Sequence, residues 1–280
     1  MKTPRLPEAL APVTLTETAP HVRAWWSSAR ISVVLLLALA PPFAVAAVTT
    51  GGQMPGIFAI CLAVVYAWQF LFATVRKRSV DLDGALTAAL FAMLIPVDVP
   101  IWQIVLGVTF GVVIGEQIFG GRGRNILNPV VVGLSFLIFS FPTGGYDFPG
   151  AAGALWSIPG AVLLIVTGLA SWRIVAAAAI GLMLSAALLG GANPVAEVLA
   201  GGFIFGVVFL ACDPVCASAT NPGRWLYGLL IGFLVYLGRV GSDGTADGLI
   251  AAVLIAQIFA PLADYGVVQV NRWMRERRRG

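Results

Sequence analysis

The sequence is poor in charged residues. Of its 280 residues only 11% are Asp, Glu, Lys or Arg, whereas 59% are hydrophobic. A soluble domain usually carries about 25% charged and about 45–50% apolar residues, so this composition excludes an ordinary soluble protein. Because the backbone of a spanning segment must satisfy its hydrogen bonds within the protein, the apolar runs predict an all-α polytopic membrane protein.

Histidine and cysteine are also scarce. The single histidine, His21, lies in a polar N-terminal stretch, which argues against histidine-based catalysis or metal binding. The three cysteines, Cys61, Cys212 and Cys216, lie in or beside apolar runs and form no disulfide framework. Two of them are four residues apart, but zinc and iron–sulfur sites need further ligands. We expect no metal site and assign the cysteines a packing role.

The excess of basic residues follows from membrane topology. If the N-terminus is cytoplasmic, only Arg239 of the 17 Lys and Arg residues falls near the outer side. Cytoplasmic loops of membrane proteins are enriched in Lys and Arg, so this distribution predicts an even number of spans with both termini inside. The net charge of +4 therefore requires no nucleic-acid partner. The lipid bilayer explains it.

Apolar runs of helix length divide the chain into about ten transmembrane segments, some of them short or broken. They cover residues 29–48, 56–75, 83–95, 101–119, 126–141, 158–171, 173–189, 196–212, 224–240 and 248–270. We expect a cytoplasmic N-terminal arm (1–28), a transmembrane domain (29–270) and a basic cytoplasmic tail (271–280). The tail is either an anchor at anionic lipid or a docking site for a soluble partner.

A short motif occurs twice. Gly107–Val113 recurs as Gly202–Val208, 95 positions later, and each copy is followed by an Asn-Pro pair and another apolar run. This predicts two repeats, over about 56–141 and 158–240. The repeats are parallel in our segment count, and inverted if one short segment is re-entrant. The alternative is chance recurrence in an apolar chain.

Polar residues interrupt the apolar pattern after each copy. Asp213 is followed by a proline at the inner end of a predicted span, where a carboxylate is costly unless it accepts hydrogen bonds. After the first copy come Asn125 and Asn128, and after the second comes Asn221. We expect these four side chains to converge on a flat heterocycle with polar edges, since Asn both donates and accepts hydrogen bonds and Asp accepts them. The alternative for Asp213 is an interfacial helix cap facing water.

Two further acids fall within apolar segments. Glu116 and Asp264 are candidates for an ion or proton path, because carboxylates inside a membrane are costly and often functional. Pairing with arginines on the inner side is the alternative.

Several separated motifs resemble one known family. Phe119–Pro129, Asp213–Asn221, Gly223–Gly228 and Phe259–Tyr265 resemble the membrane subunits of two redox pumps. These pumps are the sodium-translocating NADH:quinone reductase and the Rnf complex, and their related membrane subunits form the NqrB/RnfD family. The similarity covers roughly residues 60 to 272.

The resemblance implies a ten-helix component of an inner-membrane electron-transport complex, coupled to sodium or proton movement. It would work with other membrane and cytoplasmic subunits as part of a redox-driven translocase. It also implies a noncovalent riboflavin or FMN near the cytoplasmic side, whose family contacts match Asn125, Asn128 and Asp213.

The chain also departs from the family. The family attaches an FMN covalently to a Thr that ends a Ser-Gly-Ala-Thr type motif in the loop after the fifth span, but the corresponding loop here, 142–157, has only Thr143. Thr245 lies in a different loop, so we expect no covalent FMN. The glycine pair and glutamate associated with quinone are also replaced in the second span, near Gln69. The competing hypotheses are a transporter or channel for a flavin or another small polar solute, and a structural subunit without cofactors.

Overall fold

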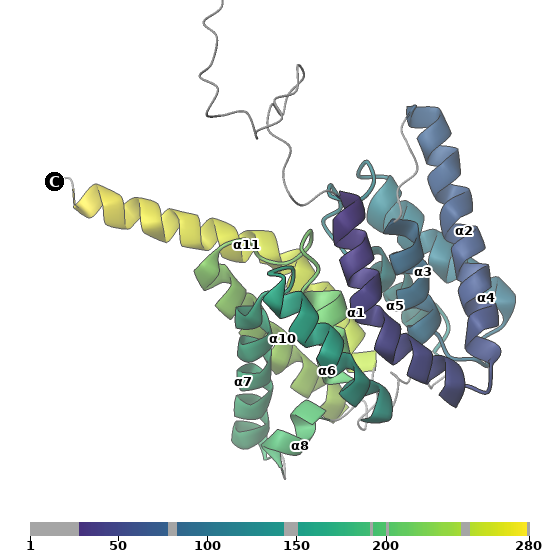
Figure 1. Cartoon of the computed structure of the whole chain (residues 1–280). Coiled ribbons are helices and arrows are strands. Elements are labelled where there is room, and N and C mark those ends of the chain that lie inside the picture. The colour runs from purple at the N-terminus through teal and green to yellow at the C-terminus, as the bar shows by residue number, and fades with distance from the viewer. Residues whose placement is uncertain are drawn as a thin grey trace, which may run out of the picture.

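The computed structural model describes residues 28–77, 83–142, 151–190, 193–199, 202–241 and 247–278, and they contain helices and no strand. The α-helices are α1 (Ser28–Thr49), α2 (Gln53–Arg76), α3 (Asp83–Leu94), α4 (Ile101–Val112), α5 (Pro129–Ser140), α6 (Ala151–Val166), α7 (Trp172–Leu189), α8 (Pro194–Leu199), α9 (Phe203–Phe205), α10 (Asn221–Gly241) and α11 (Asp247–Arg277). Two π-helical turns, η2 (Val113–Gln117) and η3 (Gly206–Ala211), continue α4 and α9. Figure 1 shows these helices as one bundle.

Length and composition confirm a polytopic membrane protein. Four segments are long and apolar enough to cross a bilayer: Ala29–Thr49, Gln53–Arg76, Trp172–Leu189 and Gly248–Arg277. Shorter apolar helices accompany them, including α3 and α5 with 12 residues each. A 12-residue helix is about 18 Å long, against a hydrocarbon core of about 30 Å, so the prediction of some short helices is also confirmed.

Two predicted segments differ from the structure. The segment expected at 158–171 is helical from residue 151, because Pro159 is accommodated inside α6. The same helix ends at Val166, before Gly168 with its left-handed φ of 74°. The single span expected at 196–212 is broken, since Gly202 adopts a φ of 64° and separates α8 from α9. Glycine adopts positive φ without the steric penalty of a side chain, so it ends or interrupts a helix readily.

The two copies of the motif adopt the same order of elements. In each, an α-helix passes into a π-helical turn, a polar loop follows, and the next helix begins at an Asn-Pro pair. The first copy runs through α4, η2 and α5, and the second through α9, η3 and α10. The two repeats, over about 56–141 and 158–240, and the relative orientation of the copies stay predictions.

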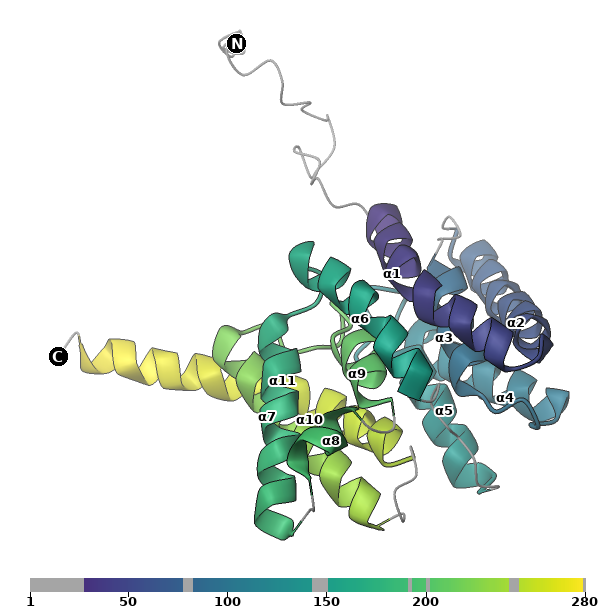
Figure 2. The same cartoon turned by 60° about the horizontal axis from the view of Figure 1, so that its bottom comes forward.

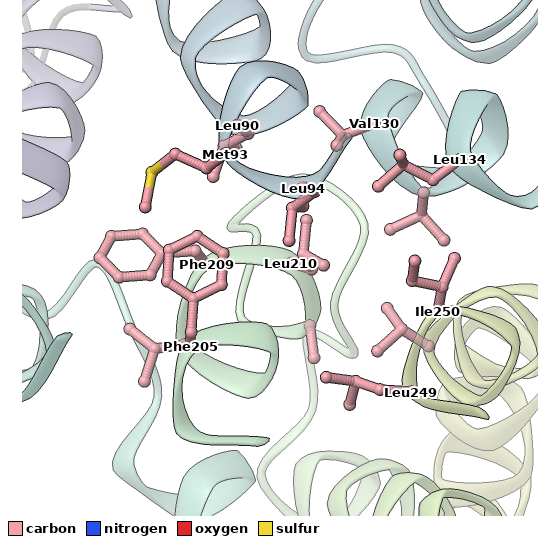
Figure 3. Packing of buried hydrophobic residues seen from close by; sticks show 14 of the residues in the cluster. Leu90, Met93, Leu94, Val130, Leu134, Phe205, Phe209, Leu210, Leu249 and Ile250 are labelled. Atoms are coloured by element: carbon pink, nitrogen blue, oxygen red, sulfur yellow. The ribbon is translucent and has the colours of Figure 1, made fainter. Parts of the chain in front are cut away.

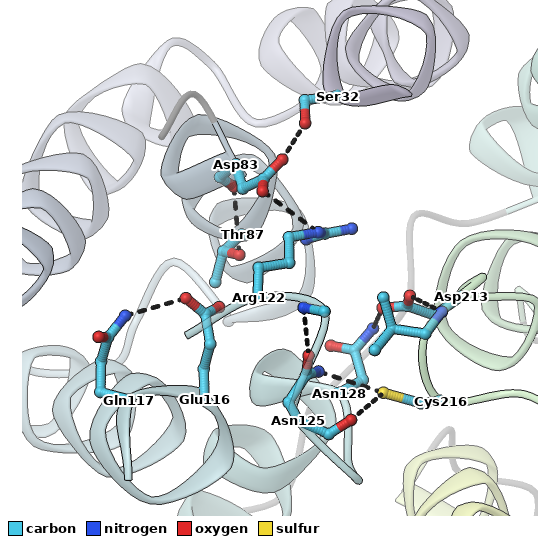
Figure 4. A network of polar contacts seen from close by, with 12 residues as sticks. Ser32, Asp83, Thr87, Glu116, Gln117, Arg122, Asn125, Asn128, Asp213 and Cys216 are labelled. Atoms are coloured by element: carbon cyan, nitrogen blue, oxygen red, sulfur yellow. Dashed lines mark hydrogen bonds and ion pairs between the residues drawn. The ribbon is translucent and has the colours of Figure 1, made fainter. Parts of the chain in front are cut away.

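The core lies where the second π-helical turn is enclosed by helices of both halves. All six residues of η3 are buried. Figure 3 shows Leu210 and Phe209 of this turn surrounded by side chains of α3, α5 and α11. Elsewhere α10 packs against α7 and α11, and α1 packs against α6. The loop that follows η3, with Asp213, is thereby placed beside the loop that precedes α5 (Figure 4).

Candidate functional site

Asn128 and Asp213 join the two polar loops. The first loop lies between η2 and α5, and the second loop lies between η3 and α10. Asn128 is the N-cap of α5, and its Oδ1 accepts a hydrogen bond from the Val130 amide at 2.9 Å. Its Nδ2 donates to Asp213 Oδ2 at 3.0 Å, and Asp213 Oδ1 accepts from the Val215 amide at 3.0 Å. Both side chains are buried, and their hydrogen bonds offset the cost of placing polar groups in an apolar interior. Figure 4 shows the contact between the two loops.

Asn125 contacts the same second loop through Cys216. Its Nδ2 donates to the Leu127 carbonyl at 3.0 Å and to Cys216 Sγ at 3.2 Å, and its Oδ1 accepts from the Gly123 amide at 3.2 Å. Burial, and secondarily the charge of Asp213, raises the pKa of Cys216, so the sulfur remains a thiol. Among the described residues no group of three or more His, Cys, Asp or Glu side chains could hold a metal.

Gln257 of α11 also connects the two loops, and it was not among the site residues predicted from the sequence. Its Oε1 accepts from the Asn128 backbone amide at 2.9 Å, while its Nε2 donates to the Leu210 carbonyl at 3.1 Å. The side chain is fully buried. The sequence feature that could have indicated it is a glutamine in an otherwise apolar stretch of a membrane helix.

An ion pair lies beside this link, between the buried Asp83 and the half-buried Arg122. Arg122 Nε is 3.7 Å from Asp83 Oδ2, and Asp83 also accepts a hydrogen bond from Ser32 of α1. Burial alone would lower the pKa of Arg122, but the carboxylates of Asp213, Asp83 and Glu116 together raise it. The guanidinium therefore stays charged and compensates the acids around it. Asp83 was also not among the predicted site residues, although an acidic residue at the start of a short apolar segment could have indicated it.

Asn221 does not join the buried cluster. It is exposed in the first turn of α10, where Thr220 accepts hydrogen bonds from the Gly223 amide at 3.2 Å and the Arg224 amide at 2.9 Å. The two Asn-Pro pairs therefore occupy different environments: Asn128 is a buried cap and Asn221 is not.

The two acids considered for an ion path have different surroundings. Asp264 is half-buried and accepts hydrogen bonds from Ser218 Oγ at 2.6 Å and from the amides of Ala219 and Thr220 at 2.8 and 3.0 Å, so it anchors the second loop to α11. Glu116 is buried in η2 and accepts from Gln117 Nε2 at 3.0 Å.

A small cavity lies against the Asn128–Asp213 pair. It has a volume of about 20 Å³, room for about one water. The walls are largely apolar and include Leu35, Leu90, Leu164 and Phe209, while Arg122, Asn128 and Asp213 supply polar atoms. We call this the inner cavity.

A larger pocket lies on the other side of the second loop. This outer pocket has a volume of about 260 Å³ and is lined by Ser171, Ser218, Arg224 and neighbouring residues. The two share Leu169, Cys212 and Pro214 as lining residues, so these residues separate them.

Comparison with known proteins identifies the family. The model of the NQR2, RnfD, RnfE family matches residues 15–149 and 146–272. Relatives named as subunits of the Na(+)-translocating NADH-quinone reductase include those of Pseudomonas paraeruginosa, 37% identical over 268 residues (76% of this chain, 66% of the relative), and Yersinia pestis, 37% identical over 280 residues (79% and 68%). The Azotobacter vinelandii relative is 36% identical over 270 residues (77% and 67%).

The chain thus spans about 66% of the length of the first of these relatives. The family match nevertheless covers nearly all of the transmembrane helices described above, including both polar loops and α11 up to residue 272. This chain belongs to the NQR2, RnfD, RnfE family.

Proposed function

We propose that the chain is a membrane subunit of a redox-driven translocase related to the sodium-translocating NADH-quinone reductase and the Rnf complex, and that it binds a noncovalent flavin between its two polar loops. The observation that carries the proposal is the buried hydrogen bond from Asn128 to Asp213 beside the inner cavity. It brings together two residues from separate motifs that resemble family flavin contacts.

The donor set suits the polar edge of a flavin. That edge presents both donors and acceptors, which amide side chains and a carboxylate complement. The apolar walls around Leu90 and Phe209 suit an aromatic ring system. The positive charge of Arg122 lies near Asp213, and this carboxylate is among the acids that raise the pKa of the guanidinium.

The space around the donors does not suit a whole ring system as it stands. The inner cavity holds about one water, and ligand pockets usually have volumes of about 300–1,000 Å³. The outer pocket approaches that range, but Leu169, Cys212 and Pro214 lie between. Flavin binding therefore requires this partition to move, so that the two spaces merge.

A bound flavin would supply one- and two-electron redox chemistry, which the side chains of this chain lack. The chain would hold and orient the polar edge through Asn125, Asn128 and Asp213. Glu116 and Asp264 stay candidates for a cation or proton path. In this proposal the partners are other membrane and cytoplasmic subunits, and the chain lies in the bacterial inner membrane with both termini cytoplasmic.

We further propose that no FMN is attached covalently. The loop expected to carry the attachment site has no Ser-Gly-Ala-Thr type motif, and the two segments of the family match meet at residues 146–149, within this loop. Thr143 and Thr245 lie outside the described residues.

One argument for the transporter hypothesis, a shared pathway lined by both Asn-Pro pairs, is weakened. It needed both Asn-Pro corners along one pathway, whereas Asn128 is buried and Asn221 is exposed. We keep it as an outcome of the test below.

The test is the visible spectrum of the chain purified in mild detergent, followed by a denaturing gel viewed for flavin fluorescence. We expect a flavin spectrum that disappears on denaturation and no fluorescent band. A fluorescent band would overturn the absence of covalent FMN, and a colourless protein would favour the transporter or structural hypothesis.

Variants locate the site. Asp213→Asn and Asn128→Ala should each lower flavin occupancy, whereas Asn221→Ala, which alters the exposed asparagine of the second pair, should retain it. Full occupancy in both buried variants would remove the assignment of these residues.

A further inference from the structure

The last helix continues well beyond the bundle. α11 has 31 residues, so it is about 46 Å long, whereas the hydrocarbon core is about 30 Å thick. Its buried side chains, such as Ile250, Val253 and Gln257, all precede Pro261. From Pro261 to Arg278 no residue is buried. Figures 1 and 2 both show this end projecting sideways from the bundle.

The projecting segment, residues 262–278, is amphipathic. At about 100° per residue, one side of the helix carries six of its eight apolar side chains, with Arg277 among them at the C-terminal end. Tyr265 and Val268 lie on the opposite side, with most of the polar residues. The apolar side is formed by Leu262, Ala263, Val267, Val270, Trp273 and Met274. The opposite side is formed by Asp264, Gln269, Asn271, Arg272, Arg275 and Glu276. Most of the apolar side is not covered by protein: Leu262 is 60% and Val270 is 55% exposed, while Ala263 and Val267 are half-buried.

The end of this segment is strongly basic. Residues 272–278 contain four arginines and one glutamate, a net charge of +3. Glu276 pairs with Arg272 at 3.4 Å, and the Arg277 guanidinium lies 4.2 Å from the centre of the Trp273 ring. Four arginines within seven residues make insertion of this segment across the hydrocarbon core costly. An arginine beside a tryptophan is typical of the membrane–water interface, where both side chains reach the headgroups.

We propose that residues 262–278 form an in-plane helix that binds the anionic lipid surface of the membrane. Its apolar side lies at the boundary between headgroups and acyl chains, and Arg272, Arg275 and Arg278 contact anionic headgroups. An amphipathic helix with a basic polar side lies in the interface rather than across it, and each basic residue near an anionic surface strengthens the attachment. The arginines complement anionic headgroups in charge, and the uncovered apolar side directly continues a membrane helix. Both features favour the lipid surface over a protein partner.

Spin labels on the full chain in lipid nanodiscs test the position of the helix. Val270→Cys places a label on the apolar side and Asn271→Cys places one on the polar side; unsubstituted protein controls for labelling of the buried native cysteines. In bilayers containing phosphatidylglycerol, we expect collisions with oxygen to exceed those with a water-soluble nickel chelate several-fold more at position 270 than at 271. Equal access of the chelate to both positions would overturn the in-plane helix.

The charge contribution is tested separately. In bilayers of phosphatidylcholine alone, or in the variant R272Q/R275Q/R278Q, the label at position 270 should become more accessible to the chelate. An unchanged accessibility in both conditions would overturn the role of anionic lipid. Protection of both positions from oxygen and from the chelate would instead indicate coverage by a second protein copy, and would likewise overturn the proposal.

Discussion

At the residue scale, Asn128 supports three features of the fold with one side chain and one amide. It caps α5, donates to Asp213 and, through its backbone, binds Gln257. We predict that Asn128→Ala destabilises the protein by about 1–3 kcal/mol, because it removes an N-cap and leaves a buried carboxylate oxygen short of a donor. The measurement is the unfolding temperature in detergent.

The second Asn-Pro pair supplies the control for that variant. Asn221→Ala should leave the unfolding temperature nearly unchanged, since Asn221 is exposed and the cap of α10 is Thr220. Equal effects of the two substitutions would mean that the buried contacts of Asn128 contribute nothing measurable.

Gln257 makes a second prediction at this scale. Gln257→Leu keeps the side chain roughly in size but leaves the Asn128 amide and the Leu210 carbonyl without their partner. We expect a loss of about 1–3 kcal/mol, the cost of an unsatisfied buried polar group. Gln269→Leu, on the exposed part of the same helix, is the matched control in the same unfolding measurement.

Part of this site could be predicted from the sequence because polar residues inside a bilayer are energetically costly. An aspartate and asparagines beside prolines stand out in an apolar chain, and the structure does bring Asn128 to Asp213. Asn221 stands out equally but lies apart, since only the three-dimensional packing decides which of two similar corners is enclosed. Gln257 and Asp83 escaped notice because they share no motif with the loops they contact.

At the element scale, glycines bring α7 and α10 into close contact. A Cβ added at Gly228 would lie 2.6 Å from the Ile174 carbonyl oxygen, and one at Gly181 would lie 2.7 Å from the Leu229 carbonyl oxygen. Backbone atoms of this kind cannot move aside as a side chain could. Small residues at such crossings let membrane helices approach closely.

We therefore predict that Gly228→Ala separates α7 from α10 and costs about 1–3 kcal/mol through overpacking. Gly56→Ala in α2 meets open space and should be neutral or slightly stabilising, because alanine favours a helix more than glycine does. Unfolding temperatures of the two variants in detergent decide the point, and a stable Gly228→Ala protein would contradict the tight crossing.

Helix positions were largely predictable at this scale, whereas their irregularities were not. Apolar runs placed α2, α3 and α7 well because length and hydropathy determine a span. The start of α11 was also placed well, but the helix continues beyond residue 270 to Arg277. The π-helical turns η2 and η3 accompany the two copies of the recurring motif, but hydropathy and segment length do not distinguish a π-helical turn from an α-helical one. The break at Gly202 depends on a positive φ, which glycine permits but does not require.

At the scale of the whole molecule, the basic residues predict one orientation of the chain in the membrane. Arg239 was the exception to the basic side, and it is paired with Glu197 at 2.7 Å, with its side chain only 11% exposed. The charge of Arg239 is therefore compensated within the protein, and the predicted orientation depends on the remaining lysines and arginines. These act through the bilayer, since basic residues beside spans are retained on the cytoplasmic side.

This arrangement predicts the location of the C-terminus. A fluorescent-protein reporter that matures only in the cytoplasm, fused after the last residue, should fluoresce in bacterial cells. The same reporter fused after Gly241, at the end of α10, should stay dark, because α11 is then missing and the chain ends on the opposite side. A periplasmic phosphatase fused at the two positions should give the reverse pattern. Fluorescence at both positions would mean that α11 does not cross the membrane, and a dark reporter at the C-terminus would invert the orientation deduced from the basic residues.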